Sequence, residues 1–224
     1  MSDPKKNPYA GGSVPSNGSL MRVAPVPIYF KNNLKKAMET AALQSMLTHN
    51  TPEPTDACAY LAQMIVRAID GEPLSDIIIP PKEAPIRNSD ILNLASDKAK
   101  WRSYTEDQVM TLPGRALWTL EAALWCLSHS NNFKDAIILA VNLAGDSDTV
   151  AAVTGQVAGA LYGVQSIPQA LIPQPLHFLE SFGSTLTLTL TLTLNVLPLG
   201  VAQCVVQSRA DPSARSCSLR PRPL

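Results

Sequence analysis

The sequence predicts an all-α domain. Before Ser184, apolar residues recur almost throughout at the three-to-four-residue spacing that places them on one face of a helix. Short segments that contain Pro, Gly or Asn separate these stretches, and no alternation of strands with helices is visible. With 224 residues, 46% of them hydrophobic, the chain is long enough to bury one sizeable core.

Two helices are predicted first, over Asn33–Leu47 and Thr55–Asp70. Each carries an apolar stripe at helical spacing. The stripe consists of Leu34, Ala37, Met38, Ala41 and Leu47 in the first helix and of Cys58, Leu61, Ala62, Ile65 and Ile69 in the second. A His-Asn-Thr-Pro connection separates the two helices, and Gly71 follows the second, where glycine commonly ends a helix.

A proline-rich stretch, residues 73–85, then interrupts the helical pattern. After this stretch the periodicity predicts helices over Asp90–Lys100, Leu117–Leu127 and Phe133–Leu143. Either Asn131 or Asn132 can cap the third of these helices, because an asparagine side chain accepts hydrogen bonds from the first N–H groups of a helix.

The last predicted helix begins near Asp148 and continues as AAVTGQVAGALYG. Its residues are apolar on nearly all faces, which indicates a buried helix at the centre of the fold. Gly155 and Gly159 lie about one turn apart, so the backbone of another helix can approach closely at these positions.

Composition limits the possible partners. The 18 basic and 18 acidic side chains balance, so the chain has no net field to attract nucleic acid or an anionic membrane. No apolar run reaches the ~18–20 residues that cross a bilayer, and the first residues lack the apolar core of a signal peptide. The four cysteines form no CxxC pair and are expected to be reduced. We therefore expect a cytoplasmic protein without nucleic-acid or membrane partners.

The last part of the chain differs from the rest. Residues Thr185–Leu194 are five consecutive Thr-Leu pairs, and a basic segment with four Arg and one Asp follows them. An alternating, low-complexity run with no evident pairing partner does not suit a helical core. We divide the chain into a helical domain, residues 1–183, and a low-complexity tail, residues 184–224, which we expect to be disordered.

The segment Gly145-Asp146-Ser147-Asp148-Thr149 lies where the last helix begins. Two carboxylates and a hydroxyl within one turn form the hard oxygen set that Mg²⁺, Mn²⁺ or Ca²⁺ prefers. The alternative is that Asp148 or Thr149 only caps the helix and Asp146 lies in a solvated turn. Because the helix that follows is too apolar for the surface, we interpret these acids as the floor of a cleft.

A second candidate element is Ser16-Asn17-Gly18-Ser19-Leu20-Met21-Arg22, a polar loop that leads into an apolar segment. Its backbone N–H groups can bind a phosphate, Gly18 permits close approach of a ligand, and Arg22 can hold an anion. Asn-Gly is also a common turn, and a lone Arg is often a surface residue. His49, between two predicted helices, is the third candidate.

These residues together resemble a known family. The ordered set SNGSLMR, TH before a helix, LEAALWCL and LAGDSDTVAAVTGQVAGALYG is similar to the ADP-ribosylglycohydrolase family, which includes the dinitrogenase-reductase-activating glycohydrolase. The resemblance implies a compact all-α fold with two Mg²⁺ or Mn²⁺ ions in a cleft that binds ADP-ribose. It also implies hydrolysis of the bond between ADP-ribose and a protein side chain or related acceptor, so that ADP-ribose or an ADP-ribosylated protein is the expected partner.

The resemblance assigns roles by position. It implies metal binding by Asp146, Asp148 and Thr149, and substrate binding by Asn17, Gly18, Ser19, Met21, Arg22 and His49. The family's first helices carry a Thr-Asp-Asp metal motif and the catalytic acid, and this chain starts after them. We therefore expect an N-terminally truncated domain, with no catalytic acid assigned and little or no turnover. The alternatives are a non-catalytic ADP-ribose binder and a purely helical scaffold.

One segment imitates the missing motif. Thr105-Glu106-Asp107 has a similar composition, but it lies between the Asn-Gly loop and the GDSDT segment, where the family has no metal ligand. A threonine followed by two acids is typical of a helix start. We therefore predict that Thr105 caps a helix.

Overall fold

The computed structural model describes residues 15–110, 112 and 114–168, and the prediction of an all-α domain is confirmed. The described residues form helices and no strand, apart from one isolated antiparallel bridge between Ser16 and Arg115. The predicted tail, residues 184–224, lies outside the described residues. None of the helices in the described part of the chain combines the length and the apolar character that a membrane span requires.

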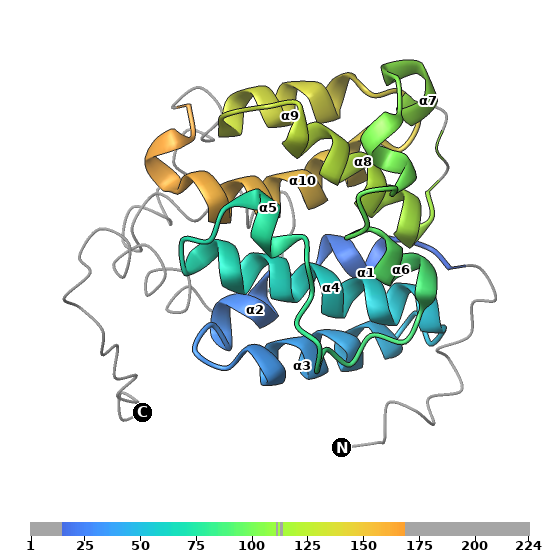
Figure 1. Ribbon diagram of the computed structural model, residues 1–224, viewed down its shortest axis with the longest axis vertical. Coiled ribbons are helices and arrows are strands. Elements are labelled where there is room, and N and C mark those ends of the chain that lie inside the picture. The colour runs from blue at the N-terminus through green and yellow to red at the C-terminus, as the bar shows by residue number, and fades with distance from the viewer. Residues whose placement is uncertain (1–14, 111, 113, 169–224) are drawn as a thin grey trace, which may run out of the picture.

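The helices follow in this order: α1 (Gly18–Met21), α2 (Pro25–Tyr29), α3 (Leu34–Met46), α4 (Pro52–Ile69), α5 (Leu74–Ile77), α6 (Ser89–Asn93), the 3₁₀ helix η2 (Lys100–Ser103), α7 (Glu106–Met110), α8 (Ala116–Ser128), α9 (Phe133–Asn142), α10 (Ser147–Tyr162) and the 3₁₀ helix η3 (Val164–Ser166). They stack in three levels (Figure 1). The helices α2 and α3 lie at one end, α4 crosses the middle, and α8, α9 and α10 form the other end.

The helix α4 is the centre of this stack. It packs against α3 on one side and against α8 and α10 on the other. Its side chains are therefore buried around nearly the whole helix, and not only along the predicted stripe. The helix also begins three residues before the predicted start, at Pro52, because proline is tolerated in the first turn, where no N–H donor is needed.

Most of the other predicted helices are found with ends shifted by one or two residues. Asn33 caps α3 by accepting a hydrogen bond from the Lys36 N–H at 3.0 Å, and Asn132 caps α9 by accepting from the Asp135 N–H at 2.9 Å. The helix α7 begins directly after Thr105, as predicted, and the Gln108 side chain accepts a hydrogen bond from the Thr105 N–H.

The single helix predicted over residues 90–100 is wrong. The chain forms the short helix α6, which ends at Asn93, and only becomes helical again at Lys100 in η2. Between them the Ser96 hydroxyl accepts a hydrogen bond from the Lys98 N–H at 3.2 Å. A serine side chain that bonds a nearby backbone N–H competes with the helical ladder, which explains the break.

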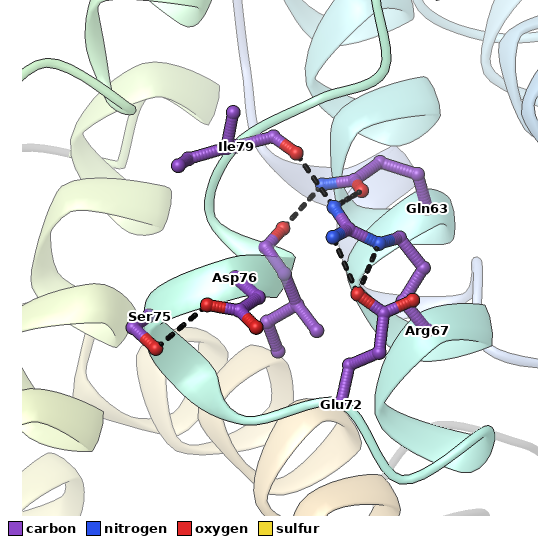
Figure 2. Close-up of polar contacts among 7 residues, drawn as sticks. Gln63, Arg67, Glu72, Ser75, Asp76 and Ile79 are labelled. Atoms are coloured by element: carbon purple, nitrogen blue, oxygen red, sulfur yellow. Dashed lines mark hydrogen bonds and ion pairs between the residues drawn. The ribbon is translucent and has the colours of Figure 1, made fainter.

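The proline-rich stretch contains a short helix, α5, where the sequence predicted an interruption of the helical pattern. Side chains from α4 hold this segment in place (Figure 2). Gln63 donates to the Ile77 carbonyl at 2.7 Å, and Arg67 donates to the Ile79 carbonyl at 2.6 Å. Arg67 also forms a two-pronged ion pair with Glu72. These contacts fold the chain after α4 back onto the same helix.

The helix α10 is buried as predicted, between α4, α8 and α9. The prediction that another helix backbone approaches closely is not confirmed at Gly155, where an added Cβ would stand 3.2 Å from the Ile137 Cδ1 of α9. The partner at this point is an apolar side chain of the neighbouring helix. Tight packing along α10 fixes the position of its first turn, where the predicted acids lie.

Candidate functional site

The structure brings the two main sequence motifs together at one hydrogen-bonded junction. The Asn17 side-chain amide, which is buried, donates to Asp146 Oδ2 at 2.5 Å. The same amide donates to Thr119 Oγ1 at 2.8 Å. One asparagine therefore connects the start of α1, the first part of α8 and the first turn of α10, although Asn17 and Asp146 are 129 positions apart in the sequence.

The predicted metal ligands share the start of α10. Asp146 precedes the helix, and its Oδ1 accepts a hydrogen bond from the buried Thr149 hydroxyl at 2.9 Å. The Thr149 hydroxyl also lies 3.7 Å from the Met21 sulfur, so Met21 reaches this cluster from α1. Asp148 points to solvent from the first turn. The arrangement thus offers one carboxylate fixed by two hydrogen bonds and a second carboxylate that is accessible.

The predicted Asn-Gly loop is in fact the start of a helical turn, α1, with Asn17 at its cap position. The Asn17 side chain does not cap this turn, because its amide is engaged by Asp146 and Thr119. Two glutamines, one from α3 and one from α10, donate hydrogen bonds to carbonyls of the α1 turn. Gln44 of α3 donates to the Ser19 carbonyl at 3.1 Å, and Gln156 of α10 donates to the carbonyls of Leu20 and Met21 at 3.1 and 3.2 Å.

The Ser19 side chain points into the protein. It is fully buried and accepts hydrogen bonds from the Ser45 hydroxyl at 2.9 Å and from the Cys58 thiol at 3.3 Å. Burial raises the pKa of Cys58 to about 11, so the sulfur remains a protonated donor at neutral pH. Ser19 therefore anchors α1 to α3 and α4, and its hydroxyl does not face solvent.

The Arg22 guanidinium is bound to α3 and the segment after it. Its Nε donates to Gln44 Oε1 at 2.9 Å, and its Nη2 donates to the Gln44 carbonyl at 3.2 Å and to Thr48 Oγ1 at 2.5 Å. Most of its donors thus serve to fix the turn that Gln44 also holds. Arg22 therefore lies beside the site with most of its donors engaged within the protein.

His49 lies over Gly18, on the same side as Arg22. An added Cβ at Gly18 would stand 3.2 Å from the imidazole Cε1 and 3.3 Å from its Nε2. The other ring nitrogen, Nδ1, is 2.7 Å from Thr48 Oγ1. Burial of the ring and, next, the positive charge of Arg22 lower the pKa of His49, so the neutral imidazole is favoured at neutral pH.

An ion pair between the buried Glu53 and the partly exposed Arg115 lies next to the junction. Glu53, in the first turn of α4, accepts two hydrogen bonds from Arg115 Nε at 2.8 and 2.9 Å and a further one from Arg115 Nη2. It also accepts from the Leu117 N–H at the start of α8. On the other side of Arg115 the Ala116 N–H donates to the Pro15 carbonyl at 2.9 Å. These contacts fix the segment that includes Gly114.

A cavity of about 490 Å³ lies next to this segment, between the α6–η2 region and α8. Arg115, Trp118 and the buried Glu121 contribute to its lining. Glu121 accepts a hydrogen bond from the Tyr104 hydroxyl at 3.0 Å, and burial raises the pKa of this carboxyl group. The cavity volume falls within the ~300–1,000 Å³ of typical small-molecule sites.

Gly114 is required by the geometry of the junction. An added Cβ would stand 2.9 Å from Asp146 Oδ2, which is too close, and 3.6 Å from Asn17 Nδ2. We expect Gly114→Ala to displace the Asp146 carboxylate and to lower the free energy of unfolding by about 1–2 kcal/mol in urea titrations. In an Asp146→Ala background the same substitution is expected to cost clearly less. An equal cost in both backgrounds would mean that the backbone, and not the carboxylate, opposes the alanine.

Several residues of the site were missed by the sequence analysis. Thr119, Gln44 and Gln156 all lie within helices, where their side chains bond partners that are distant in the sequence. Gln156 carried a usable signal, because a lone amide in the apolar run AAVTGQVAGA needs buried hydrogen-bond partners. Gln44 and Thr119 carried none, since a polar residue at either position also suits an exposed helix face. Of the two histidines without an assigned role, His129 stacks on Trp125, and His177 lies outside the described residues.

The fold and the site together define a helical protein whose polar site is built at the start of a buried helix. The chain belongs to the ADP-ribosylglycohydrolase family, because the family model of that name matches residues 2–192. This finding confirms the resemblance that the sequence motifs indicated. The match begins before the first described residue and includes part of the Thr-Leu run.

Individual relatives agree with this assignment. The chain is 40% identical over 156 residues to an ADP-ribosylarginine hydrolase Tri1 of Pseudomonas putida (70% of this chain, 41% of the relative). It is 27% identical over 161 residues to the ADP-ribosyl-[dinitrogen reductase] glycohydrolase of Rhodospirillum rubrum (72% of this chain, 50% of the relative). A solved ADP-ribosylglycohydrolase-related protein complex aligns with a TM-score of 0.66 at 29% identity (89% of this chain, 63% of that chain). The chain thus spans only about two fifths to one half of these two curated relatives.

Proposed function

We propose that this chain forms part of the ADP-ribose cleft of an ADP-ribosylglycohydrolase, whose complete site performs metal-dependent hydrolysis of the bond between ADP-ribose and a protein side chain. The observation that carries the proposal is the Asn17 amide, which connects the α1 turn to Asp146 at the start of α10. The two motifs of the family resemblance therefore meet at one place. Arginine is the proposed acceptor, because two relatives with 40% and 37% identity are named ADP-ribosylarginine hydrolases.

We assign metal binding to Asp146, Asp148 and Thr149. Their donors are hard oxygens, which suit Mg²⁺ or Mn²⁺. Within the described residues, no three His, Cys, Asp or Glu side chains lie close enough to hold an ion, so water or bound ligand would have to complete the coordination. A bound divalent cation lowers the pKa of a coordinated water and orients it. The pair of ions implied by the family resemblance is part of this proposal.

The remaining residues bind and orient the ligand in this proposal. Gly18 and Gly114 allow His49 and Asp146 to pack close to the backbone, because an added Cβ would stand 3.2 Å from the His49 ring and 2.9 Å from Asp146 Oδ2. The Asn17 amide fixes the direction of the Asp146 carboxylate, and Gln44 and Gln156 hold the α1 turn against which the ligand packs. A site held by such interlocked hydrogen bonds is preorganised, which reduces the free energy needed to order it on binding.

Calorimetric titration of the full chain with ADP-ribose, with Mg²⁺ and with chelator, tests the proposal. We expect Mg²⁺ to raise the affinity at least tenfold, which corresponds to ~1.4 kcal/mol. Asp148→Ala is expected to remove this gain. Asp107→Ala is the matched control, because Asp107 is also an exposed acid at the second position of a helix.

The outcomes separate the proposed functions. Equal binding with Mg²⁺ and with chelator would contradict the metal assignment and support a non-catalytic ADP-ribose binder. Absence of binding under both conditions would contradict both functions for this chain. Release of ADP-ribose from an ADP-ribosylarginine peptide, followed under the same two conditions, tests the hydrolytic step itself.

A further inference from the structure

A continuous series of hydrogen bonds connects helix α3 to the imidazole of His49. Gln44 holds the Arg22 guanidinium through its side-chain and backbone oxygens. Arg22 Nη2 donates to Thr48 Oγ1 at 2.5 Å, and this oxygen is 2.7 Å from His49 Nδ1. The donor or acceptor role of each atom in this series decides which nitrogen of His49 carries the proton.

The direction of these hydrogen bonds follows from Arg22. A guanidinium has only donors, so Thr48 Oγ1 must accept from Arg22. The threonine O–H is then free to donate to Nδ1, and the dipoles of the two hydrogen bonds align head to tail and reinforce each other. The opposite arrangement would point an Nδ1–H dipole at an oxygen that already faces a positive charge. A neutral ring with Nδ1 as acceptor carries its proton on Nε2.

The position of the ring determines where the Nε2–H group points. Nε2 is the nitrogen on the edge that faces Gly18, and it makes no hydrogen bond within the described residues. Because Gly18 has no side chain, this ring edge packs closely on the α1 turn, beside Asn17 of the Asp146 junction, and His49 as a whole is only partly buried. An Nε2–H group at this place can donate to an oxygen of a ligand that lies along the α1 turn.

We propose that Arg22 and Thr48 are positioning residues that keep His49 as a neutral imidazole with the proton on Nε2, directed at an oxygen of the bound ligand. The protonated nitrogen follows from the hydrogen bonds alone. The identification of the acceptor as a phosphate or ribose oxygen of ADP-ribose rests on the proposed function. This reassigns Arg22 from a ligand of the substrate to a residue that acts through His49.

Long-range ¹H–¹⁵N NMR of the full chain measures the tautomer directly. The chain has three histidines, so a His49→Gln spectrum identifies the signals of His49. In the wild type we expect an unprotonated Nδ1 and a protonated Nε2 at neutral pH. Thr48→Val is expected to produce a mixture of tautomers and to raise the pKa of the ring by about half a unit, as expected for loss of one hydrogen bond to the neutral form.

Thr48→Ser keeps the hydroxyl and is the matched control, with the wild-type spectrum expected. Thr48 is exposed, so both variants should fold, and their thermal unfolding midpoints check this. Arg22 is the charged residue whose field acts on the ring, and it is present in both variants. A proton on Nδ1 in the wild type, or a Thr48→Val spectrum equal to that of the wild type, would overturn the proposal.

Titration of the same variants with ADP-ribose tests the role of the proton. We expect Thr48→Val to weaken binding about fivefold, in the range of one misplaced hydrogen bond, and Thr48→Ser to remain within about twofold of the wild type. If no variant binds ADP-ribose while the NMR result holds, the proposed function fails and the tautomer assignment stands. If the wild type binds and Thr48→Val binds equally well, His49 does not donate to the ligand.

Discussion

Replacing Glu53 with Ala is expected to lower the free energy of unfolding by about 2–4 kcal/mol, close to the ~3–5 kcal/mol typical of breaking a buried ion pair. The Glu53 carboxylate is 6% exposed and accepts hydrogen bonds from Arg115 and from the Leu117 N–H at the start of α8. Its removal takes these hydrogen-bond acceptors away from the guanidinium and the Leu117 N–H, and the guanidinium keeps its contact with the Trp118 ring. The effect is below the upper limit because the Arg115 side chain is 36% exposed and can regain water.

The chain contains a matched control for this substitution. Arg67 and Glu72 form a similar two-pronged pair, but the Glu72 side chain is 39% exposed (Figure 2). Glu72→Ala is therefore expected to cost no more than about 1 kcal/mol, as for other solvent-exposed pairs. Urea titrations of both variants measure the difference. Equal effects would mean that burial of Glu53 adds nothing to the strength of its pair.

Glu53 also affects the candidate site. It holds Arg115, which follows Gly114, and Gly114 packs against the Asp146 carboxylate. Glu53→Gln keeps an acceptor for the Leu117 N–H and a neutral acceptor for Arg115, so we expect a smaller loss of stability than for Glu53→Ala. If Glu53→Gln loses less stability than Glu53→Ala, the difference measures the hydrogen bond to α8, and the loss in Glu53→Gln measures the contribution of the charge.

The helices could be predicted from the sequence because their signals are local. A 3.6-residue pattern with an asparagine at its start is contained within one segment. The structure confirms the predicted cap at Asn132, and Asn33, which was predicted only as the first residue of a helix, also caps one. The break at Ser96 was missed because one serine hydroxyl changes the local hydrogen bonding without altering the apolar pattern. Element ends depend on such side-chain bonds more than on periodicity.

The arrangement of the site could be predicted only in part. The sequence indicated that Asn17 and Asp146 belong to functional motifs, but their hydrogen bond spans 129 positions and no local pattern encodes it. The inward direction of the Ser19 side chain also depends on tertiary packing, because Ser45 and Cys58 come from two other helices. The identity of a polar residue can thus be read from a motif, while its direction requires the packed structure.

Replacing Asn17 with Asp is expected to have the largest effect at the site. The substitution keeps the shape of the side chain but places an oxygen where the Nδ2 donor lies 2.5 Å from Asp146 Oδ2. Thr119 can adapt, because its hydroxyl can turn to donate, but Asp146 has no proton to offer when ionised. At pH 8 in chelator, we expect a loss of about 3 kcal/mol in the free energy of unfolding and at least tenfold weaker ADP-ribose binding.

The loss of stability expected for Asn17→Asp depends on pH. Two carboxylates in contact cannot both ionise easily, so the folded variant binds one proton more than its unfolded chain above the ordinary carboxyl pKa of ~4. The extra proton stabilises the folded variant at low pH, and the deficit relative to the wild type grows as pH rises. Asn33→Asp is the control, because the Asn33 side chain accepts from the Lys36 N–H and aspartate caps a helix equally well. A deficit for Asn17→Asp that stays constant between pH 5 and pH 8 would show that Asp146 does not face the new carboxylate.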